Sequence, residues 1–181
     1  ASSSSVYGHN KNKNNKELDS TSKPLSMYSA SKKTNELFAY MYTNLYQMQT
    51  IGLRFFTVYG EYSRPDMFFS KLATSIKSNK KIYVYNGGNL YRDYTFISDL
   101  VDSMIKLIKL KNGKGNRYEI YNIGNSKKIK LTKIIKIFEK YYKKKANIVN
   151  AKLSKGEVKR TKSNINKLKR TIKIKKFKNI E

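Results

Sequence analysis

The sequence contains no cysteine and a single histidine, His9. The absence of cysteine excludes a disulfide framework and any thiolate metal site, and one histidine cannot build a His-rich metal site. No apolar run approaches the roughly 18 residues that a membrane-spanning helix needs, and no signal peptide is recognisable. We therefore expect a soluble cytoplasmic protein with no bound metal and no membrane partner, whose 181 residues suffice for one real core.

Acidic residues are also scarce, with 12 Asp and Glu against 39 Lys and Arg, giving a net charge of +27. Such a charge raises the possibility of a nucleic-acid-binding module. Only six of the basic residues are arginine, the residue that usually reads bases and phosphates with paired donors. The lysines are spread along the chain among Asn and Ile. This favours solvated faces over a specific nucleic-acid site.

Periods of apolar residues, β-rich runs and turn residues predict strands that alternate with helices, which is typical of an α/β fold. No internal repeat is visible. The expected elements are, in order, a strand end and turn over 1–8, a loop over 8–25, a helix over 28–46, a strand over 50–56, a loop over 58–65, a helix over 66–78, a strand over 81–85, a turn over 86–89, a strand over 91–97, a helix over 98–110, a loop over 112–116, a strand over 118–123 and a helix over 131–142. Beyond residue 143 the basic chain gives no clear pattern.

The stretch from Ser26 to Lys32 opens the helix expected over 28–46. Ser26 is a suitable N-cap, and an apolar stripe follows at Leu37, Met41, Leu45 and Met48. Tyr28 and Lys32 are four residues apart, so they share a helix face with about 6 Å between their Cβ atoms. A lysine there stabilises a phenolate, which suits a tyrosine for acid–base work. Alone, the pair is more typical of a solvated helix start than of a catalytic site.

Four further motifs accompany this pair, always in one order. They are Ser-Ser-x-x-Val-Tyr-Gly over 2–8, Leu-Arg-Phe-Phe-Thr-Val-Tyr-Gly over 53–60, Tyr-Arg-Asp-Tyr-Thr-Phe-Ile-Ser-Asp over 91–99 and Tyr-Asn-Ile-Gly over 121–124. Together with Tyr-x-x-x-Lys, the chain resembles the extended short-chain dehydrogenase/reductase family, the nucleotide-sugar epimerases and dehydratases, over nearly its whole length. The resemblance implies NAD as cofactor and a nucleotide sugar as substrate.

Arg64-Pro65-Asp66-Met67 and the serine run over 1–8 resemble the UDP-glucuronate 4-epimerase branch of this family. Family dehydratases carry an Asp-Glu pair where Ser4 and Ser5 stand, and the decarboxylating enzymes carry a Glu in that run. The lack of an acid here favours reversible oxidation without elimination. The implied reaction is 4-epimerisation of a UDP-sugar, UDP-glucuronate to UDP-galacturonate, through a 4-keto intermediate.

The resemblance assigns three catalytic residues by their motif positions: Ser3, which hydrogen-bonds the sugar hydroxyl, Tyr28, the base, and Lys32, which holds the nicotinamide ribose. Tyr28 and Lys32 therefore also contact the cofactor, and Phe55 and Val58 are further candidates for that role.

Five residues are candidates for substrate binding. Ser4, Ser5, Thr57 and Arg64 would bind the sugar and its carboxylate, and Arg92 would contact the UDP diphosphate, because a guanidinium matches carboxylate and phosphate oxygens.

Structural interpretations of the same residues stay open. Ser3, Ser4 and Ser5 suit a polar strand end, Thr57 a loop hydrogen bond, Arg64 a surface charge, and Arg92 with Asp93 a local ion pair. Tyr59 and Phe55 also suit core packing, Asp99 a helix cap, and Asn86-Gly87-Gly88 a hairpin.

The sequence has no Gly-x-x-Gly-x-x-Gly or Gly-x-Gly-x-x-Gly turn for a dinucleotide pyrophosphate. We therefore expect a fragment that lacks the N-terminal dinucleotide-binding half and is inactive alone. Residues 1–60 would be the C-terminal part of a Rossmann-type doubly wound sheet, with the catalytic Ser and the Tyr-x-x-x-Lys pair. Residues 61–181 would be mainly a small mixed α/β nucleotide-sugar-binding lobe, truncated at its C-terminus and interleaved with the sheet.

The resemblance implies a homodimer for the full-length protein only, through a four-helix bundle that includes the helix over 28–46. Other functions stay open at this point. They are a different nucleotide-sugar epimerase of the family, an inactive remnant that binds a nucleotide sugar, and, more distantly, a basic nucleic-acid-binding module whose DNA affinity would fall steeply with salt.

Overall fold

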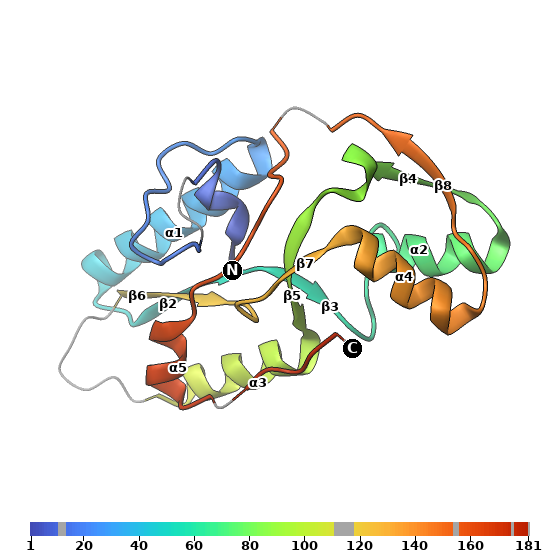
Figure 1. The fold of residues 1–181 in the computed structure, drawn as a ribbon. Coiled ribbons are helices and arrows are strands. Elements are labelled where there is room, and N and C mark those ends of the chain that lie inside the picture. Colours follow the sequence, from blue (N-terminus) through green and yellow to red (C-terminus); the bar gives the residue numbers. More distant parts are fainter. Residues whose placement is uncertain (11–13, 111–117, 154–155, 175, 181) are drawn as a thin grey trace.

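The structure is a computed structural model, and it describes residues 1–181 except 11–13, 111–117, 154–155, 175 and 181 (Figure 1). It confirms the expected α/β class. A parallel sheet joins β1 (Ser2–Ser3), β2 (Thr50–Phe55) and β6 (Tyr118–Ile123) in the order β1-β2-β6. Helix α1 (Met27–Tyr46) contacts β1 and β2, whereas α3 (Ile97–Ile108) and α5 (Asn166–Ile172) lie together on the other side of the sheet (Figure 1). Helices on both faces of a parallel sheet make the doubly wound arrangement.

A second region holds the smaller sheets. Strands β3 (Thr57–Tyr59) and β5 (Tyr91–Phe96) are parallel, and β7 (Lys128–Lys130) joins β5 antiparallel. Farther out, β4 (Lys81–Tyr85) pairs in parallel with β8 (Asn147–Ala151), beside α2 (Phe68–Ser78) and α4 (Leu131–Tyr142), which contact each other (Figure 1). The 3-10 helix η2 (Asn86–Gly88) follows β4. Because β4 pairs with β8 and α2 contacts α4, the mixed α/β lobe is assembled from segments far apart in the sequence.

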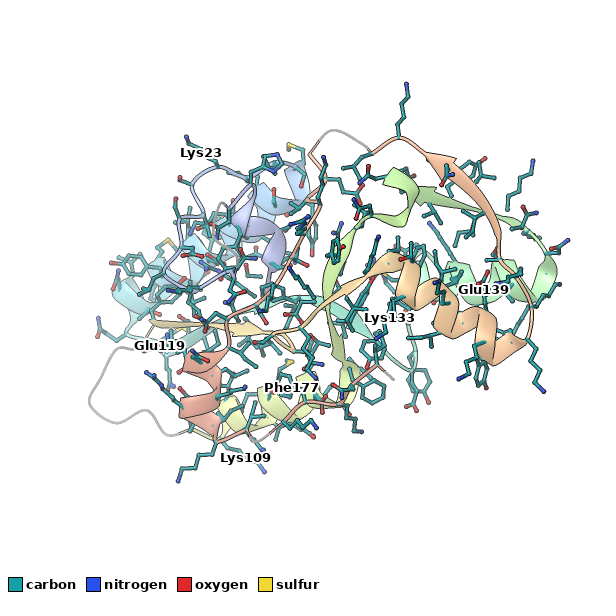
Figure 2. All side chains as sticks on the ribbon, in the orientation of Figure 1. Lys23, Lys109, Glu119, Lys133, Glu139 and Phe177 are labelled. Carbon is teal, nitrogen blue, oxygen red and sulfur yellow. The ribbon has the colours of Figure 1, made fainter. Side chains whose placement is uncertain are left out.

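Two apolar clusters form the core. One lies in the lobe, where Leu72, Ile76 and Ile134 are fully buried between α2 and α4. The other lies under the parallel sheet and includes Ile123, Leu168 and Phe177. Phe177, near the C-terminus, reaches this cluster beside α3 (Figure 2). Each part of the fold thus has its own buried apolar centre.

Helix α1 begins as expected, since the Ser26 hydroxyl accepts a hydrogen bond from the Ser29 backbone N–H at 3.1 Å. Its apolar stripe does not face the sheet. Leu37 and Leu45 are 57% and 66% exposed, and the side chains that α1 buries are polar. They are Ser29, Glu36 and Thr43. Helix α1 therefore packs on the sheet through polar contacts and leaves an apolar face open.

Three local predictions were wrong. Val58 and Tyr59, expected in a loop, belong to strand β3, because residues 57–59 pair with β5. Asn86-Gly87-Gly88 does not make a hairpin, since β4 pairs with β8 and not with β5. Asp99 does not cap α3, whose N-cap Phe96 has no side-chain hydrogen bond; the Asp99 carboxylate accepts instead from the Lys178 backbone N–H at 2.7 Å. The loop expected over 112–116 lies outside the described residues.

Among the described residues, no helix combines the length and the apolar character that crossing a bilayer requires.

Candidate active site

The serine run lies at the carboxyl edge of the parallel sheet. Ser3 is paired with Phe55 across β1 and β2, and Phe55 is paired with Ile123 across β2 and β6. Thr57 follows two residues after Phe55, so it lies just beyond the same edge. Open α/β sheets bind ligands outside the carboxyl ends of their strands. The register thus brings Ser3, Phe55 and Thr57 to the edge where a ligand is expected.

Beyond Ser3 the chain turns into a 3-10 helix, η1 (Ser4–Tyr7), which the buried side chains Val6 and Tyr7 anchor. The Ser3 hydroxyl accepts a hydrogen bond from the Ser5 backbone N–H at 3.2 Å. The Ser5 hydroxyl is buried and has no hydrogen-bond partner within the described part of the chain. The run is therefore a turned, partly buried structure with an unpaired hydroxyl, and not only a polar strand end.

Helix α1, which carries the Tyr-x-x-x-Lys pair, contacts both η1 and β1, the two elements of the serine run. Tyr28 lies in the first turn of α1 and is 57% exposed. The Lys32 ammonium lies over the Tyr28 ring, 5.7 Å from its centroid. An exposed phenol with an adjacent cation is arranged to meet a ligand that arrives from solvent.

Arg92 lies at the wall of a cavity of about 660 Å³ between β5 and the lobe. Its guanidinium is 3.7 Å from the Glu157 carboxylate and donates a hydrogen bond to the Tyr91 carbonyl at 3.0 Å. Burial lowers the pKa of Arg92, and the Glu157 charge opposes this only in part. The cavity is lined by Thr57, Pro65, Asp66, Met67, Phe68, Phe69, Lys71, Thr74, Ser75, Lys80, Lys81, Ile82, Tyr83, Tyr85, Leu90, Arg92, Tyr94, Leu131 and Glu157.

A second cavity, of about 430 Å³, lies beside the serine run. Ser4 and Tyr7 form one wall, and the segment from Val158 to Lys162 forms another. The remaining lining residues are Gly8, Asn10, Asn14, Asn15 and Lys128. The two cavities border one segment, because Glu157 lines the first and the next residue, Val158, lines the second.

Arg64 is not brought to the cavity wall. Its side chain is 74% exposed and pairs with the Asp66 carboxylate at 3.0 Å, although its neighbours Pro65 and Asp66 line the larger cavity. The interpretation of Arg92 and Asp93 as an ion pair was wrong, because Arg92 pairs with Glu157.

Phe55 and Val58 are half-buried and pack against the apolar cluster under the sheet, and Tyr59 packs against the lobe cluster. Core packing thus explains the position of Tyr59. Phe55 and Val58 also pack in the core, and they lie close to the carboxyl edge of the sheet as well.

Asp93 is fully buried and anchors the segment that borders both cavities. Its carboxylate accepts hydrogen bonds from the Ser163 N–H at 2.9 Å, the Ser163 hydroxyl at 2.6 Å, the Asn125 N–H at 2.7 Å and the Ser126 N–H at 3.0 Å. Burial raises the pKa of Asp93, and these donors offset the increase only in part.

The motif analysis missed a buried network behind the serine run. The Arg54 guanidinium pairs with the Glu36 carboxylate through Nε at 2.7 Å and Nη2 at 2.9 Å, and both residues are 2% exposed. Arg54 also donates to the Tyr7 hydroxyl at 3.0 Å, and Tyr7 donates to Asn122 at 2.6 Å. Burial raises the pKa of Tyr7 to about 12, so this hydroxyl stays protonated and acts as a donor. One signal was available, a lone arginine inside an apolar strand.

A doubly wound sheet with a serine run and a Tyr-x-x-x-Lys helix at its carboxyl edge defines a class of nucleotide-dependent α/β proteins. The sequence profile of the NAD dependent epimerase/dehydratase family matches residues 1–124, more than half of the chain. The chain belongs to this family, and the recognised resemblance is confirmed.

Two sequence relatives and one solved structure illustrate the match. The chain is 54% identical over 106 residues to an uncharacterised Methanocaldococcus jannaschii protein, MJ1055, which covers 59% of the chain and 32% of that protein. It is 43% identical over 107 residues to a probable UDP-glucuronate 4-epimerase of Rhizobium meliloti, covering 59% and 31%. A crystal structure of the Bacillus cereus UDP-glucuronic acid 4-epimerase with UDP-glucuronic acid and NAD superposes with a TM-score of 0.90 at 30% identity, over 98% of the chain and 55% of that protein. The chain thus spans about a third to a half of the length of these proteins.

Proposed function

We propose that this chain contributes the catalytic and sugar-binding part of an NAD-dependent 4-epimerase acting on a UDP-sugar, UDP-glucuronate to UDP-galacturonate. The observation that carries the proposal is the placement of Ser3, Thr57 and the Tyr28–Lys32 pair around one sheet edge. Family membership and the likeness to UDP-glucuronate 4-epimerases support it.

The described residues fit one end of NAD. The Tyr28 phenol is exposed, with the Lys32 ammonium over its ring, so both can hydrogen-bond a ribose hydroxyl beside a nicotinamide. When bound, the cofactor supplies a site that accepts a hydride and returns it.

The residues of this chain then act on the sugar. Tyr28 takes the proton of the C4 hydroxyl while C4 loses its hydride, and Ser3 hydrogen-bonds the same oxygen. Between the two half-reactions the 4-keto sugar rotates, so that it presents the opposite face of C4. With the cofactor bound, the hydride would return to the opposite face of C4, and Tyr28 would give back the proton to form the inverted alcohol. Because oxidation and reduction cancel, no net redox change results.

We assign different parts of the substrate to different places around the two cavities. The larger one receives the nucleotide, with Arg92 facing the diphosphate, since a guanidinium fork matches phosphate oxygens. Thr57 lines the same cavity and lies beside the serine run, so the sugar lies between Thr57 and Ser4. Ser5 has a free buried hydroxyl for a further hydrogen bond.

The test is an assay of the full-length gene product with NAD and UDP-glucuronate, followed by chromatography. Appearance of UDP-galacturonate supports the proposal. A folded protein that holds NAD and leaves every UDP-sugar unchanged contradicts it, and UDP binding by calorimetry then shows whether it is a binding remnant.

A second candidate substrate is a neutral UDP-sugar, favoured by the exposed Arg64 that pairs with Asp66 instead of lining the cavity. Arg64→Ala separates the two. If Arg64 turns to bind the carboxylate, the variant raises the KM for UDP-glucuronate by about 10- to 100-fold, the range for one hydrogen-bonded charge. Activity on UDP-glucose stays unchanged. The matched control is Arg170→Ala, an exposed arginine on α5. Equal KM values in Arg64→Ala and wild type favour the neutral sugar.

We also propose that the full-length protein is a homodimer through α1. The open apolar face of this helix supports it, with Leu45 66% and Tyr46 62% exposed. Leu45→Glu should give a monomer in sedimentation analysis, because a charge would be buried in the interface. Leu18→Glu is the matched control, since Leu18 is 98% exposed on a loop. A Leu45→Glu dimer would refute this interface.

A further inference from the structure

The Glu36 carboxylate is the meeting point of three segments. It accepts the Ser2 hydroxyl at 2.6 Å, both guanidinium donors of Arg54, and the Lys33 ammonium at 3.1 Å. It is 2% exposed and therefore shielded from water. Burying a carboxylate is costly unless its oxygens are fully hydrogen-bonded, and here four donors satisfy them.

The position of Glu36 on α1 relates it to the candidate base. Tyr28, Lys32 and Glu36 are spaced four residues apart, so they follow one another along the same side of α1. The side runs from the exposed phenol at the helix start to the buried carboxylate two turns later. A shift of α1 that moved Tyr28 would therefore also move Glu36 against its partners.

Two partners of Glu36, Ser2 and Arg54, belong to the sheet. Ser2 and Arg54 are directly opposite each other in the parallel register of β1 and β2. Ser2 is bonded covalently to Ser3, the candidate catalytic serine. One carboxylate therefore joins the helix that carries Tyr28 to the strand that carries Ser3.

We propose that Glu36 is a positioning residue that sets the distance between Ser3 and Tyr28, acting through the Ser2 hydroxyl and the Arg54 guanidinium. The inference rests on the proposed function, because it assumes that these two residues act on one sugar hydroxyl. A misplacement of about 1 Å between reacting groups can cost on the order of a hundredfold in rate. The cavity walls that bind the nucleotide do not include Glu36, so substrate binding stays unaffected.

The experiment is Ser2→Ala in the full-length gene product, since it removes one link and leaves the Glu36–Arg54 pair intact. We expect kcat to fall by about 10- to 100-fold with KM for the nucleotide sugar within twofold. The matched control is Ser103→Ala on α3. Ser103 is 1% exposed and donates one hydrogen bond of 2.7 Å to the Asp99 carbonyl, so it loses an equivalent contact away from the site. Its kcat should stay within twofold of wild type.

A double variant tests the route of the effect. If Ser2 acts through Glu36, adding Ser2→Ala to Glu36→Gln lowers kcat little beyond Glu36→Gln alone. Multiplicative losses, or a wild-type kcat in Ser2→Ala, overturn the proposal. Hydrogen exchange of the backbone gives a readout that needs no activity. The expected result is faster exchange over residues 2–7 in Ser2→Ala but not in Ser103→Ala. Unchanged exchange in Ser2→Ala overturns the proposal. This readout does not depend on turnover, so it separates a failure of the positioning role from a failure of the proposed function, in which the wild-type protein converts no nucleotide sugar.

Discussion

Tyr28→Phe in the full-length gene product should lower kcat for C4 epimerisation by about a thousandfold, within the range that general acid–base groups contribute. The change removes only the phenolic oxygen that takes and returns the C4 hydroxyl proton. The ring stays in place with the Lys32 ammonium above it, 5.7 Å from its centroid in the parent chain. KM should therefore change little, and the loss should lie in kcat. NAD content is measured beside it, because the Tyr28 hydroxyl is also proposed to contact the ribose.

The control for this variant is Tyr42→Phe on the same helix. Tyr42 is 47% exposed and its ring is tilted against that of Tyr46, with 5.3 Å between ring centroids, so it is a half-exposed tyrosine on the same helix as Tyr28. Chromatography of the UDP-sugars and deuterium transfer at C4 measure turnover. If Tyr28→Phe retained more than a tenth of the wild-type kcat, another group would be the base and the assignment of Tyr28 would be wrong.

Elements governed by local signals were predicted closely from the sequence. Helix α1 begins one residue before the predicted start, because the Ser26 cap acts within its own turn. Helix α4 has the predicted bounds, Leu131–Tyr142, because its apolar period is strong. Strands β3, β7 and β8 were missed. Strands β3 and β7 pair with β5, more than 30 residues away, and β8 pairs with β4, more than 60 residues away, and no local pattern encodes such pairings.

The candidate site was assigned from motifs and not from chemistry. The motifs indicated Ser3, Tyr28 and Lys32 as catalytic candidates, and the parallel register pairs Ser3 with Phe55 at the carboxyl edge of the sheet. The buried polar residues that join α1 to the sheet were not predicted. Glu36 reads as one more helical charge, and its partner Arg54 lies 18 residues along the chain. Only the packing of α1 on the sheet shows that the two are 2% exposed. The ion pair considered between Arg92 and Asp93 was wrong for the same reason, since Glu157 pairs with Arg92 from a distant segment.

The largest stability effect should come from Arg54→Leu. The variant leaves the Glu36 carboxylate buried without its main partner, and breaking a buried pair in this way costs about 3–5 kcal/mol. Urea unfolding of the full-length gene product measures the loss. Arg170→Leu is the control, an exposed arginine whose replacement should cost less than about 0.5 kcal/mol. The double variant Glu36→Leu with Arg54→Leu should cost less than the sum of the two single changes, because no charge then stays buried.

The pH dependence identifies the carboxylate as the cause. Burial would raise the pKa of Glu36, but the hydrogen bonds from Arg54, Ser2 and Lys33 and the Arg54 charge together hold it below its ordinary value. In the wild type, Glu36 therefore stabilises the fold above about pH 4.3, its unfolded pKa, and this is lost as pH falls through the folded pKa. In Arg54→Leu, burial prevails and the folded pKa rises above that value, so the penalty grows with pH. The stability gap between wild type and variant should widen from pH 5 to pH 8. A gap equal at both values would mean that lost packing of the guanidinium, and not an unpaired carboxylate, destabilises the variant.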